Sequence, residues 1–111
     1  LEEAAYQIQA YLAGTLKVFS FPYQAKGTAF QKKVWSSLLT IPYGETRSYK
    51  DIATLINRPT AYRAVGSANN KNQLPLIIPC HRVIGSDQTL VGYAGGLKIK
   101  EFLLILEAKN R

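Results

Sequence analysis

The chain has 111 residues, of which 47% are hydrophobic and 19% are charged, with one cysteine and one histidine. This size and composition indicate one soluble globular domain, and no apolar run approaches the roughly 20 residues that a transmembrane helix needs. A lone cysteine excludes an intrachain disulfide, and the sequence shows no secretory leader. We therefore expect a reducing, intracellular location: cytoplasm or nucleoid, or the nucleus in a eukaryote. Because the chain begins at Leu1 and contains no methionine, we expect it to be part of a longer protein.

The chain is strongly basic. Its 14 Lys and Arg residues outnumber 7 Asp and Glu residues, which gives a net charge of +7. Such an excess attracts a polyanion, and nucleic acid is the favoured partner. A basic surface without a specific partner explains the charge equally well, so motifs have to decide between the two.

Residues 1–26 are predicted to contain a helix and one strand. The helix spans residues 1–11 and ends near Gly14, and its apolar positions are Leu1, Ala4, Ala5, Ile8 and Leu12. β-branched and aromatic residues over 15–21 favour a strand that ends at Pro22. We expect residues 1–26 to be a remnant or linker segment that precedes a domain over 27–111.

Two helices with capping boxes follow. In the first, Thr28 and Gln31 form the box, and the shared apolar face consists of Phe30, Val34, Leu38 and Ile41. A turn is predicted at residues 42–44. In the second helix, Ser48 and Asp51 form the box, residues 57–59 end the helix, and the apolar stripe consists of Tyr49, Ile52, Ala53 and Ile56.

A third short helix is predicted after Thr60, which can serve as its N-cap. The side chains on its surface are unusually small: Ala61, Ala64, Val65 and Ala68 lie on one side, with Gly66 and Ser67 beside them. Two short helices joined by a tight break are typical of a helix-turn-helix, whose second helix enters a groove of DNA. A helical hairpin packed through alanine is the alternative, and the nearby positive charges of Arg58, Arg63 and Lys71 favour DNA.

The last third of the chain predicts a small β-hairpin and a closing helix. Two prolines bound the apolar run 74–79, which should be extended and buried. Residues 80–84, a turn at 85–87 and residues 90–91 predict the hairpin, and a loop follows over 92–96. The closing helix spans 97–109, with Ile99, Phe102, Leu103 and Leu106 facing inward. The predicted fold class is therefore mainly α with a small β-hairpin.

The only histidine directly follows the only cysteine. A thiol attacks as its thiolate and needs a base or positive surroundings. Neighbouring side chains of an extended segment point to opposite sides, so His81 would act on Cys80 through a water or from a bent backbone. A third group should orient the imidazole. Taken singly, an inert buried cysteine and a structural histidine remain the alternatives.

Residues 79–83, with the sequence PCHRV, resemble the active-site signature of the O6-alkylguanine-DNA alkyltransferases, also called methylated-DNA-protein-cysteine methyltransferases. The resemblance runs from about residue 27 to 107 through segments 41–45, 48–49, 63–66, 72, 92–93 and 95–97. It implies a winged helix-turn-helix domain, a monomer, that binds double-stranded DNA from the minor groove and flips the damaged base into a pocket. It also implies irreversible, single-turnover transfer of an alkyl group from O6-alkylguanine, with O4-alkylthymine as a second substrate, to Cys80. No cofactor is implied.

The resemblance also assigns roles to individual residues. The catalytic set contains the nucleophile Cys80, its activator His81, Glu107 to orient His81, and Tyr49 to protonate the departing guanine. In the DNA-binding set, Arg63 fills the gap left by the flipped base and Asn72 braces the turn before the active-site segment. The remaining DNA-binding residues are Ala64, Gly66 and Ser67, and the pocket residues are Pro75, Tyr93, Ala94, Gly95 and Gly96.

The chain departs from the family pattern at Ala94, where many relatives have a serine, so we expect one hydrogen bond to the base to be missing. Because its only cysteine and histidine are both used, no protein zinc site is expected. A non-catalytic helix-turn-helix module that binds DNA or lesions is the alternative, but it would not need the motif at residues 79–83. A cysteine hydrolase would need an oxyanion hole and would leave the basic surface unused.

Overall fold

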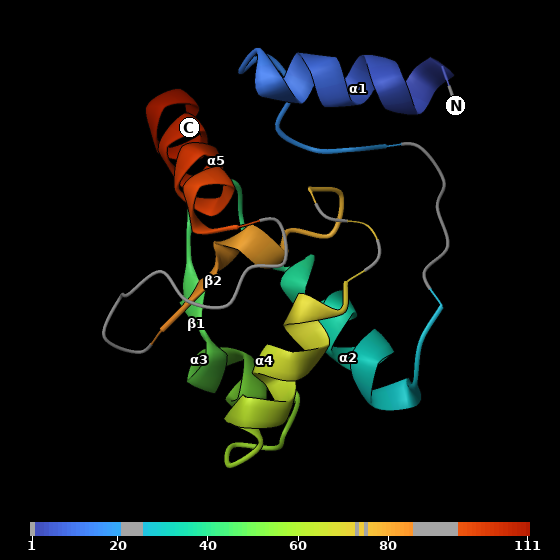
Figure 1. Cartoon of the computed structure of the whole chain (residues 1–111), viewed down its shortest axis with the longest axis vertical. Helices are drawn as coiled ribbons and strands as arrows, with labels where there is room; N and C mark the ends of the chain where they lie inside the picture. Colours follow the sequence, from blue (N-terminus) through green and yellow to red (C-terminus); the bar gives the residue numbers. More distant parts are fainter. Residues whose placement is uncertain (1, 21–25, 73, 75, 86–95) are drawn as a thin grey trace.

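A computed structural model of the chain describes residues 2–20, 26–72, 74, 76–85 and 96–111 (Figure 1). Its helices are α1 (Glu2–Leu12), α2 (Ala29–Leu38), α3 (Tyr49–Leu55), α4 (Tyr62–Asn70) and α5 (Leu97–Asn110), with a 3₁₀ turn, η1, at Cys80–Arg82. The strands β1 (Arg47–Ser48) and β2 (Val83–Ile84) pair in parallel. The described part of the chain is mainly helical, as predicted.

Both predicted capping boxes are present. The Thr28 hydroxyl accepts the Gln31 N–H at 3.1 Å, and the Gln31 side chain accepts the Thr28 N–H at 2.9 Å. Ser48 and Asp51 make the same reciprocal pair at the start of α3. Each box satisfies donors that a helix start leaves free, which sets the first residue of the helix. The predicted apolar faces of α2 and α3 are buried through Val34, Leu38, Ile41, Ile52, Ala53 and Ile56.

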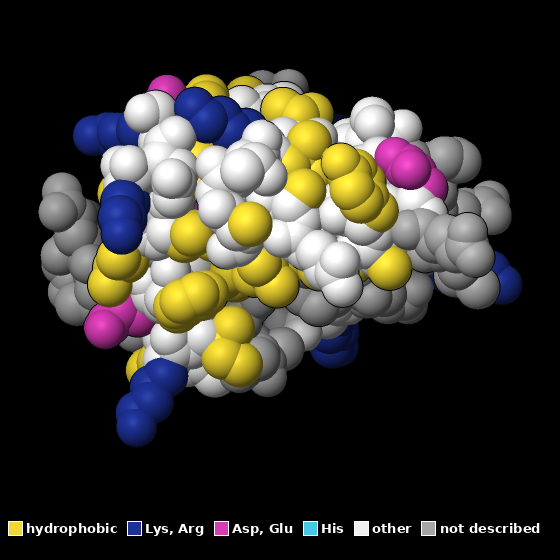
Figure 2. Space-filling model, turned by 90° about the horizontal axis from the view of Figure 1, so that it is seen from above, with side chains coloured by type: hydrophobic (Ala, Val, Ile, Leu, Met, Phe, Trp, Pro, Cys, Tyr) yellow, Lys and Arg dark blue, Asp and Glu magenta, His cyan; other side chains and the backbone are white. Residues whose placement is uncertain are grey.

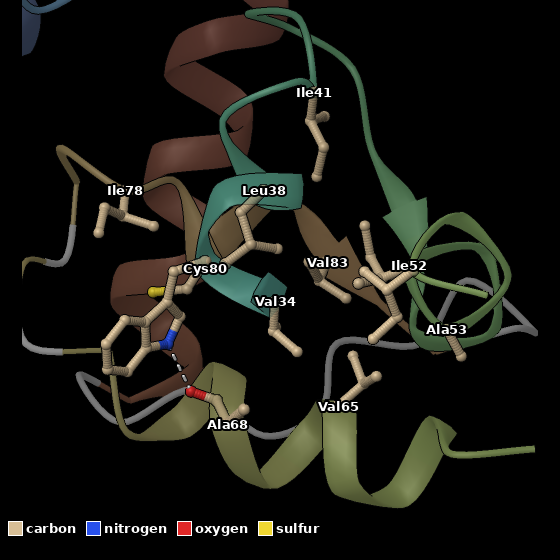
Figure 3. Close-up of a cluster of buried hydrophobic side chains, with 12 residues drawn as sticks. Val34, Leu38, Ile41, Ile52, Ala53, Val65, Ala68, Ile78, Cys80 and Val83 are labelled. Atoms are coloured by element: carbon tan, nitrogen blue, oxygen red, sulfur yellow. Dashed lines mark hydrogen bonds between the residues drawn. The ribbon is translucent and has the colours of Figure 1, made fainter. Parts of the chain in front are cut away.

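One apolar cluster lies between α2, α3, α4 and η1 (Figure 3). The Trp35 indole N–H donates to the carbonyl of Ala68 at 2.9 Å and so ties α2 to α4. Cys80 belongs to this cluster and is only 4% exposed. The helical core therefore holds the one cysteine of the chain directly.

The helices α3 and α4 pack against each other and form the predicted helix-turn-helix. Between them, Asn57 adopts a left-handed conformation with φ of 61°. The expected Thr60 cap is wrong, because Ala61 is the N-cap of α4 and no described side chain caps it. Val65 is buried, but Ala64 is exposed, so the small residues of α4 are divided between two faces.

Two extended segments predicted from the sequence are turns or irregular chain instead. Residues 15–20, the described part of the expected strand, contain no strand; their backbone bonds to α1, where Gln7 accepts the Ser20 N–H at 2.8 Å. The run expected to be extended over 74–79 contains a turn, in which the Ile78 N–H donates to the Leu74 carbonyl at 2.9 Å and Leu76 has φ of 80°. In both places a hydrogen bond outside any sheet, to the Gln7 side chain or to the Leu74 carbonyl, takes the place of a strand partner.

The described sheet differs from the predicted hairpin. Arg47 pairs with Val83 and Ser48 with Ile84, in parallel, so β2 is joined to a strand that lies far earlier in the chain. The predicted return strand at residues 90–91 lies outside the described residues. The wing of the winged helix-turn-helix therefore stays a prediction.

Polar residues are buried on α1, where an apolar stripe was expected. Tyr11 is 0% exposed and Gln7 is buried, whereas Leu12 and Ala5, both placed on the apolar stripe, are exposed. The hydroxyl of Tyr11 and the amide of Gln7 both make hydrogen bonds, which offsets the cost of their burial.

The buried face of α5 is also largely polar. Lys100 and Glu107 are buried with Leu103, but Ile99 and Phe102, expected to face inward, are 52% and 56% exposed. Figure 2, which looks onto the molecule from above the α1 and α5 end, shows apolar side chains at the surface. Among the helices in the described residues, none combines the length and apolar character that crossing a bilayer requires.

Candidate active site

The turn η1 holds Cys80 and His81 on a bent 3₁₀ backbone instead of in the extended segment that the sequence predicted. The Arg82 N–H donates to the Pro79 carbonyl at 3.1 Å, which closes the turn. The Asn69 amide on α4 donates to the Cys80 carbonyl at 3.3 Å. His81 is fully buried, so its imidazole can exchange protons only with neighbouring groups or with a water that enters the site.

Glu107 of α5 is the common acceptor of a buried polar cluster. His81 Nε2 lies 2.7 Å from Glu107 Oε2, and Arg82 donates from Nε to Oε1 at 2.8 Å and from Nη2 to Oε2 at 2.9 Å. The Gly44 N–H donates to Oε1 at 3.1 Å, and the Tyr11 hydroxyl donates to Oε2 at 2.5 Å. We call these five residues the Glu107 cluster.

The electrostatics of the cluster set the protonation of His81. Burial alone would raise the pKa of Glu107, but hydrogen bonds from His81 and Arg82, among others, lower it to about 2. Burial lowers the pKa of His81, and the hydrogen bond and charge of Glu107 oppose that shift. The pair at neutral pH is a carboxylate and a neutral imidazole whose Nε2–H points to Glu107. Nδ1 then has a free lone pair, and no described residue hydrogen-bonds to this buried nitrogen.

Gly44 contributes its backbone N–H to the cluster because of the turn at residues 42–44. Its φ is 82°, a conformation that glycine adopts without strain, and a Cβ here would lie 2.8 Å from Cδ of Arg111. The Arg111 guanidinium donates back to the Gly44 carbonyl at 3.2 Å. The turn predicted from Pro42 to Gly44 thus packs against the end of α5 and reaches Glu107.

Tyr49, at the start of α3, lies in the electrostatic surroundings of Cys80. Burial and the charge of Cys80 raise the pKa of Tyr49, and a side-chain hydrogen bond with Asn69 lowers it. The phenol therefore keeps its proton at neutral pH and can donate it. Gly66 of α4 faces the same ring, since a Cβ on Gly66 would lie 3.7 Å from Tyr49 Cε1.

Lys100 is a further charged group of the site. Its side chain is fully buried, and Nζ donates to the Val83 carbonyl at 2.5 Å. Burial lowers the pKa of Lys100 to about 8, and the charge of Cys80 acts in the opposite direction. A positive charge that interacts electrostatically with Cys80 favours its thiolate form.

Five residues of the site were not predicted as site residues from the sequence: Tyr11, Gly44, Asn69, Arg82 and Lys100. Arg82 stands inside the PCHRV motif, and Lys100, Leu103 and Glu107 share the spacing of one helix face, so both had a detectable signal. Tyr11 had none, because the contact joins residues 96 positions apart.

The predicted DNA-binding residues lie on and after α4. Arg63, Ala64 and Ser67 are exposed, whereas Gly66 is half-buried against Tyr49. Asn72 connects two backbone segments: its amide donates to the Ile78 carbonyl at 2.8 Å, and its oxygen accepts the Leu74 N–H at 3.0 Å.

Of the predicted pocket residues, the structure describes only Gly96. It is the N-cap of α5, with φ of 99°. The other four, Pro75, Tyr93, Ala94 and Gly95, lie outside the described residues. Their part in a guanine pocket stays a prediction.

Comparison with known proteins places this geometry in a family. Residues 29–109 match the family model of the 6-O-methylguanine DNA methyltransferase DNA binding domain. The chain is 61% identical to a methylated-DNA-protein-cysteine methyltransferase of Methanosarcina barkeri, over 97% of this chain and 68% of the relative. It is 56% identical to the constitutive methylated-DNA-protein-cysteine methyltransferase of Bacillus subtilis, over 96% of this chain and 66% of the relative.

A solved structure agrees with these relatives. The crystal structure of Mycobacterium tuberculosis OGT in complex with DNA superposes with a TM-score of 0.96 at 51% identity, covering 98% of this chain and 68% of that one. The chain therefore belongs to the 6-O-methylguanine DNA methyltransferase family.

Proposed function

We propose that the chain repairs DNA by moving the alkyl group of O6-alkylguanine onto Cys80 in one irreversible turnover. The observation that supports this most strongly is His81, whose Nε2 is engaged by Glu107 at 2.7 Å while Nδ1 remains an acceptor. The relatives are named for transfer from methylated DNA to a protein cysteine, and this chain has a single cysteine that can receive the group.

The chemical step balances with the residues of the site. His81 Nδ1 takes the proton of the Cys80 thiol, through a water, and the thiolate attacks the alkyl carbon on O6 of guanine. The S–C bond forms as the C–O6 bond breaks, its electron pair stays with guanine, and Tyr49 supplies the proton that neutralises the base. The imidazolium then loses its proton to solvent and Tyr49 regains one. The thioether has no easy route back to a thiol, so each molecule acts once.

Binding to duplex DNA, from the minor groove, is assigned to α4 and the residues beside it. Arg58, Arg63 and Lys71 are exposed around the helix-turn-helix, and the whole chain has a net charge of +7. Arg63 would enter the stack where the damaged base leaves it, a role suited to a long cationic side chain. Asn72 would hold the turn that links α4 to η1, through its bonds to residues 74 and 78.

Intact mass spectrometry after mixing with an oligonucleotide that contains O6-methylguanine tests the reaction. We expect the folded protein to gain one methyl group, and Cys80→Ser to gain none. An unmodified mass with DNA binding retained would indicate a non-catalytic lesion-binding module. Repeated turnover without a mass gain would indicate a hydrolase.

Arg63→Ala tests base flipping separately from chemistry. We expect the rate of repair in duplex DNA to fall on the order of tenfold, because the gap left by the base is no longer filled. Attack on free O6-benzylguanine should change little, since a free base needs no flipping. Lys109→Ala, an exposed cation on α5, is the matched control. Equal losses on both substrates would remove Arg63 from this role.

A further inference from the structure

We infer that Tyr11, on α1, is a positioning residue of the active site that acts on His81 through Glu107. The residue lies outside the segment 29–109 that matches the DNA-binding domain of the family. The inference rests on the proposed function, since it concerns how readily His81 takes the proton of Cys80.

Tyr11 and His81 share one carboxylate oxygen. The Tyr11 hydroxyl lies 2.5 Å from Glu107 Oε2, His81 Nε2 lies 2.7 Å from the same atom, and Tyr11 Oη is 3.4 Å from His81 Nε2. Tyr11 and His81 are both fully buried. A change at the phenol can therefore reach the imidazole through this shared acceptor, which lies closer to each group than the two groups lie to each other.

Aromatic packing directs the Tyr11 hydroxyl. The ring lies 5.4 Å from the ring of Phe19 and meets the ring of Tyr43 edge-on at 6.0 Å, measured between centroids. Burial raises the pKa of Tyr11, and the hydrogen bond to Glu107 raises it further. The phenol therefore remains protonated and always donates.

The Tyr11 hydroxyl has little effect on the orientation of the Glu107 carboxylate. Its main effect is on the negative charge of the carboxylate oxygen that His81 contacts. Two N–H groups of Arg82 and the N–H of Gly44 hold Glu107 without help from Tyr11. A donor on Oε2 disperses its negative charge and makes the carboxylate a weaker acceptor for His81. Tyr11 thus limits the stability of the imidazolium, and with it the amount of thiolate at Cys80.

Tyr11→Phe, which keeps the ring, tests this role. Because His81 is the only histidine, its imidazole can be followed alone by NMR. We expect its titration midpoint to move to higher pH, and alkyl transfer at neutral pH to become about two- to fivefold faster, because the thiolate-imidazolium pair is favoured. The thermal midpoint should fall, since a buried hydrogen bond is lost. Tyr6→Phe, on the exposed side of α1, is the matched control.

A faster but less stable variant distinguishes the two roles, because a purely structural tyrosine would lower both the rate and the stability. In a Glu107→Gln background, the effect of Tyr11→Phe on the His81 titration should vanish, since Tyr11 acts through that carboxylate. An equal effect in both backgrounds would overturn the inference, as would an unchanged titration and pH profile in the single variant.

A second variant covers the case in which Tyr11→Phe does not fold. Installing 3-fluorotyrosine at position 11 keeps the hydroxyl and makes it a stronger donor, so the His81 midpoint should move to lower pH. No movement would overturn the inference. If the wild-type protein accepts no alkyl group, the proposed function fails, whereas the NMR titrations still decide whether Tyr11 is coupled to His81.

Discussion

The α2, α3 and α4 unit and the Glu107 cluster are both buried, but they are held together by opposite means. The first contains aliphatic side chains such as Val34, Leu38 and Ile52, whose burial is favourable without a fixed direction. In the second, the buried Glu107 carboxylate depends on directed hydrogen bonds and on the charge of Arg82, because an unpaired buried charge is costly. The two regions should therefore respond differently to mutation and to pH.

The largest expected difference concerns Arg82. Arg82→Met removes the permanent cation from the buried Glu107 carboxylate and should cost about 3–5 kcal/mol of unfolding free energy. Urea unfolding at neutral pH measures this loss. Arg47→Met breaks an exposed pair with Glu45 at 3.2 Å and, as the control, should cost less than about 1 kcal/mol. A similarly small loss for Arg82→Met would show that the cluster does not depend on this cation.

Acid should weaken the Glu107 cluster and leave the apolar unit unchanged. The pKa of Glu107 is about 2 in the folded protein, against an ordinary value of 4.5. The stabilisation from this carboxylate, about 3 kcal/mol, is therefore complete above pH 4.5 and is lost as the pH falls towards 2. Unfolding free energies measured across this range should fall steeply for the wild type and less steeply for Glu107→Gln.

Leu38→Ala provides the contrast for the acid titration. The substitution should cost about 2–5 kcal/mol, by the same amount at each pH, because a cavity does not titrate. If the unfolding free energy of Glu107→Gln fell with decreasing pH as steeply as that of the wild type, the acid sensitivity would come from other carboxylates.

Lys100→Met should slow the reaction of Cys80 by about tenfold at neutral pH, because one buried positive charge near the thiolate is lost. The pKa of Lys100 is about 8, so the difference from the wild type should shrink above that pH. Rates with free O6-benzylguanine measure the effect without DNA binding. Lys98→Met, exposed on the same helix, is the control, and a pH-independent difference would contradict the electrostatic explanation.

The smallest expected effect is a gain in stability within the apolar unit. Gly66→Ala should stabilise α4 by roughly 0.5–1 kcal/mol, because alanine loses less backbone entropy in a helix. The added Cβ would lie 3.7 Å from Tyr49 Cε1, an ordinary contact distance. A lower thermal midpoint would instead show that α3 and α4 need the closer approach that glycine allows.

The same contrast explains which parts of the fold could be predicted. The starts of α2 and α3 depend on capping boxes within four residues of sequence, at Thr28 and Ser48, and their buried faces follow apolar spacing. These signals are local, so sequence patterns contain them. The expected strand near residue 15 failed because strand formation also needs a partner, which no local pattern supplies.

Prediction of the site had a similar limit. The adjacent Cys80 and His81 stood out in the sequence itself, whereas the role of Glu107 came from the resemblance to a family. The apolar periodicity of α5 placed Leu103 correctly but not Ile99 and Phe102. Buried polar residues such as Lys100 are exceptions to the expectation that apolar side chains form the buried face of a helix. Their burial depends on hydrogen-bond acceptors elsewhere in the fold. Tyr11 could be placed only once the two ends of the chain had been brought together.

The location of Trp35 has a practical consequence for following the reaction. It is the only tryptophan of the chain, and its indole lies in the same buried cluster as Cys80, fixed by its bond to Ala68. Thiols and thiolates quench excited indole differently from thioethers, so emission should change as Sγ is alkylated. The protein therefore contains its own fluorophore for stopped-flow recording, and the amplitude of the change in emission would be proportional to the fraction of molecules that have reacted.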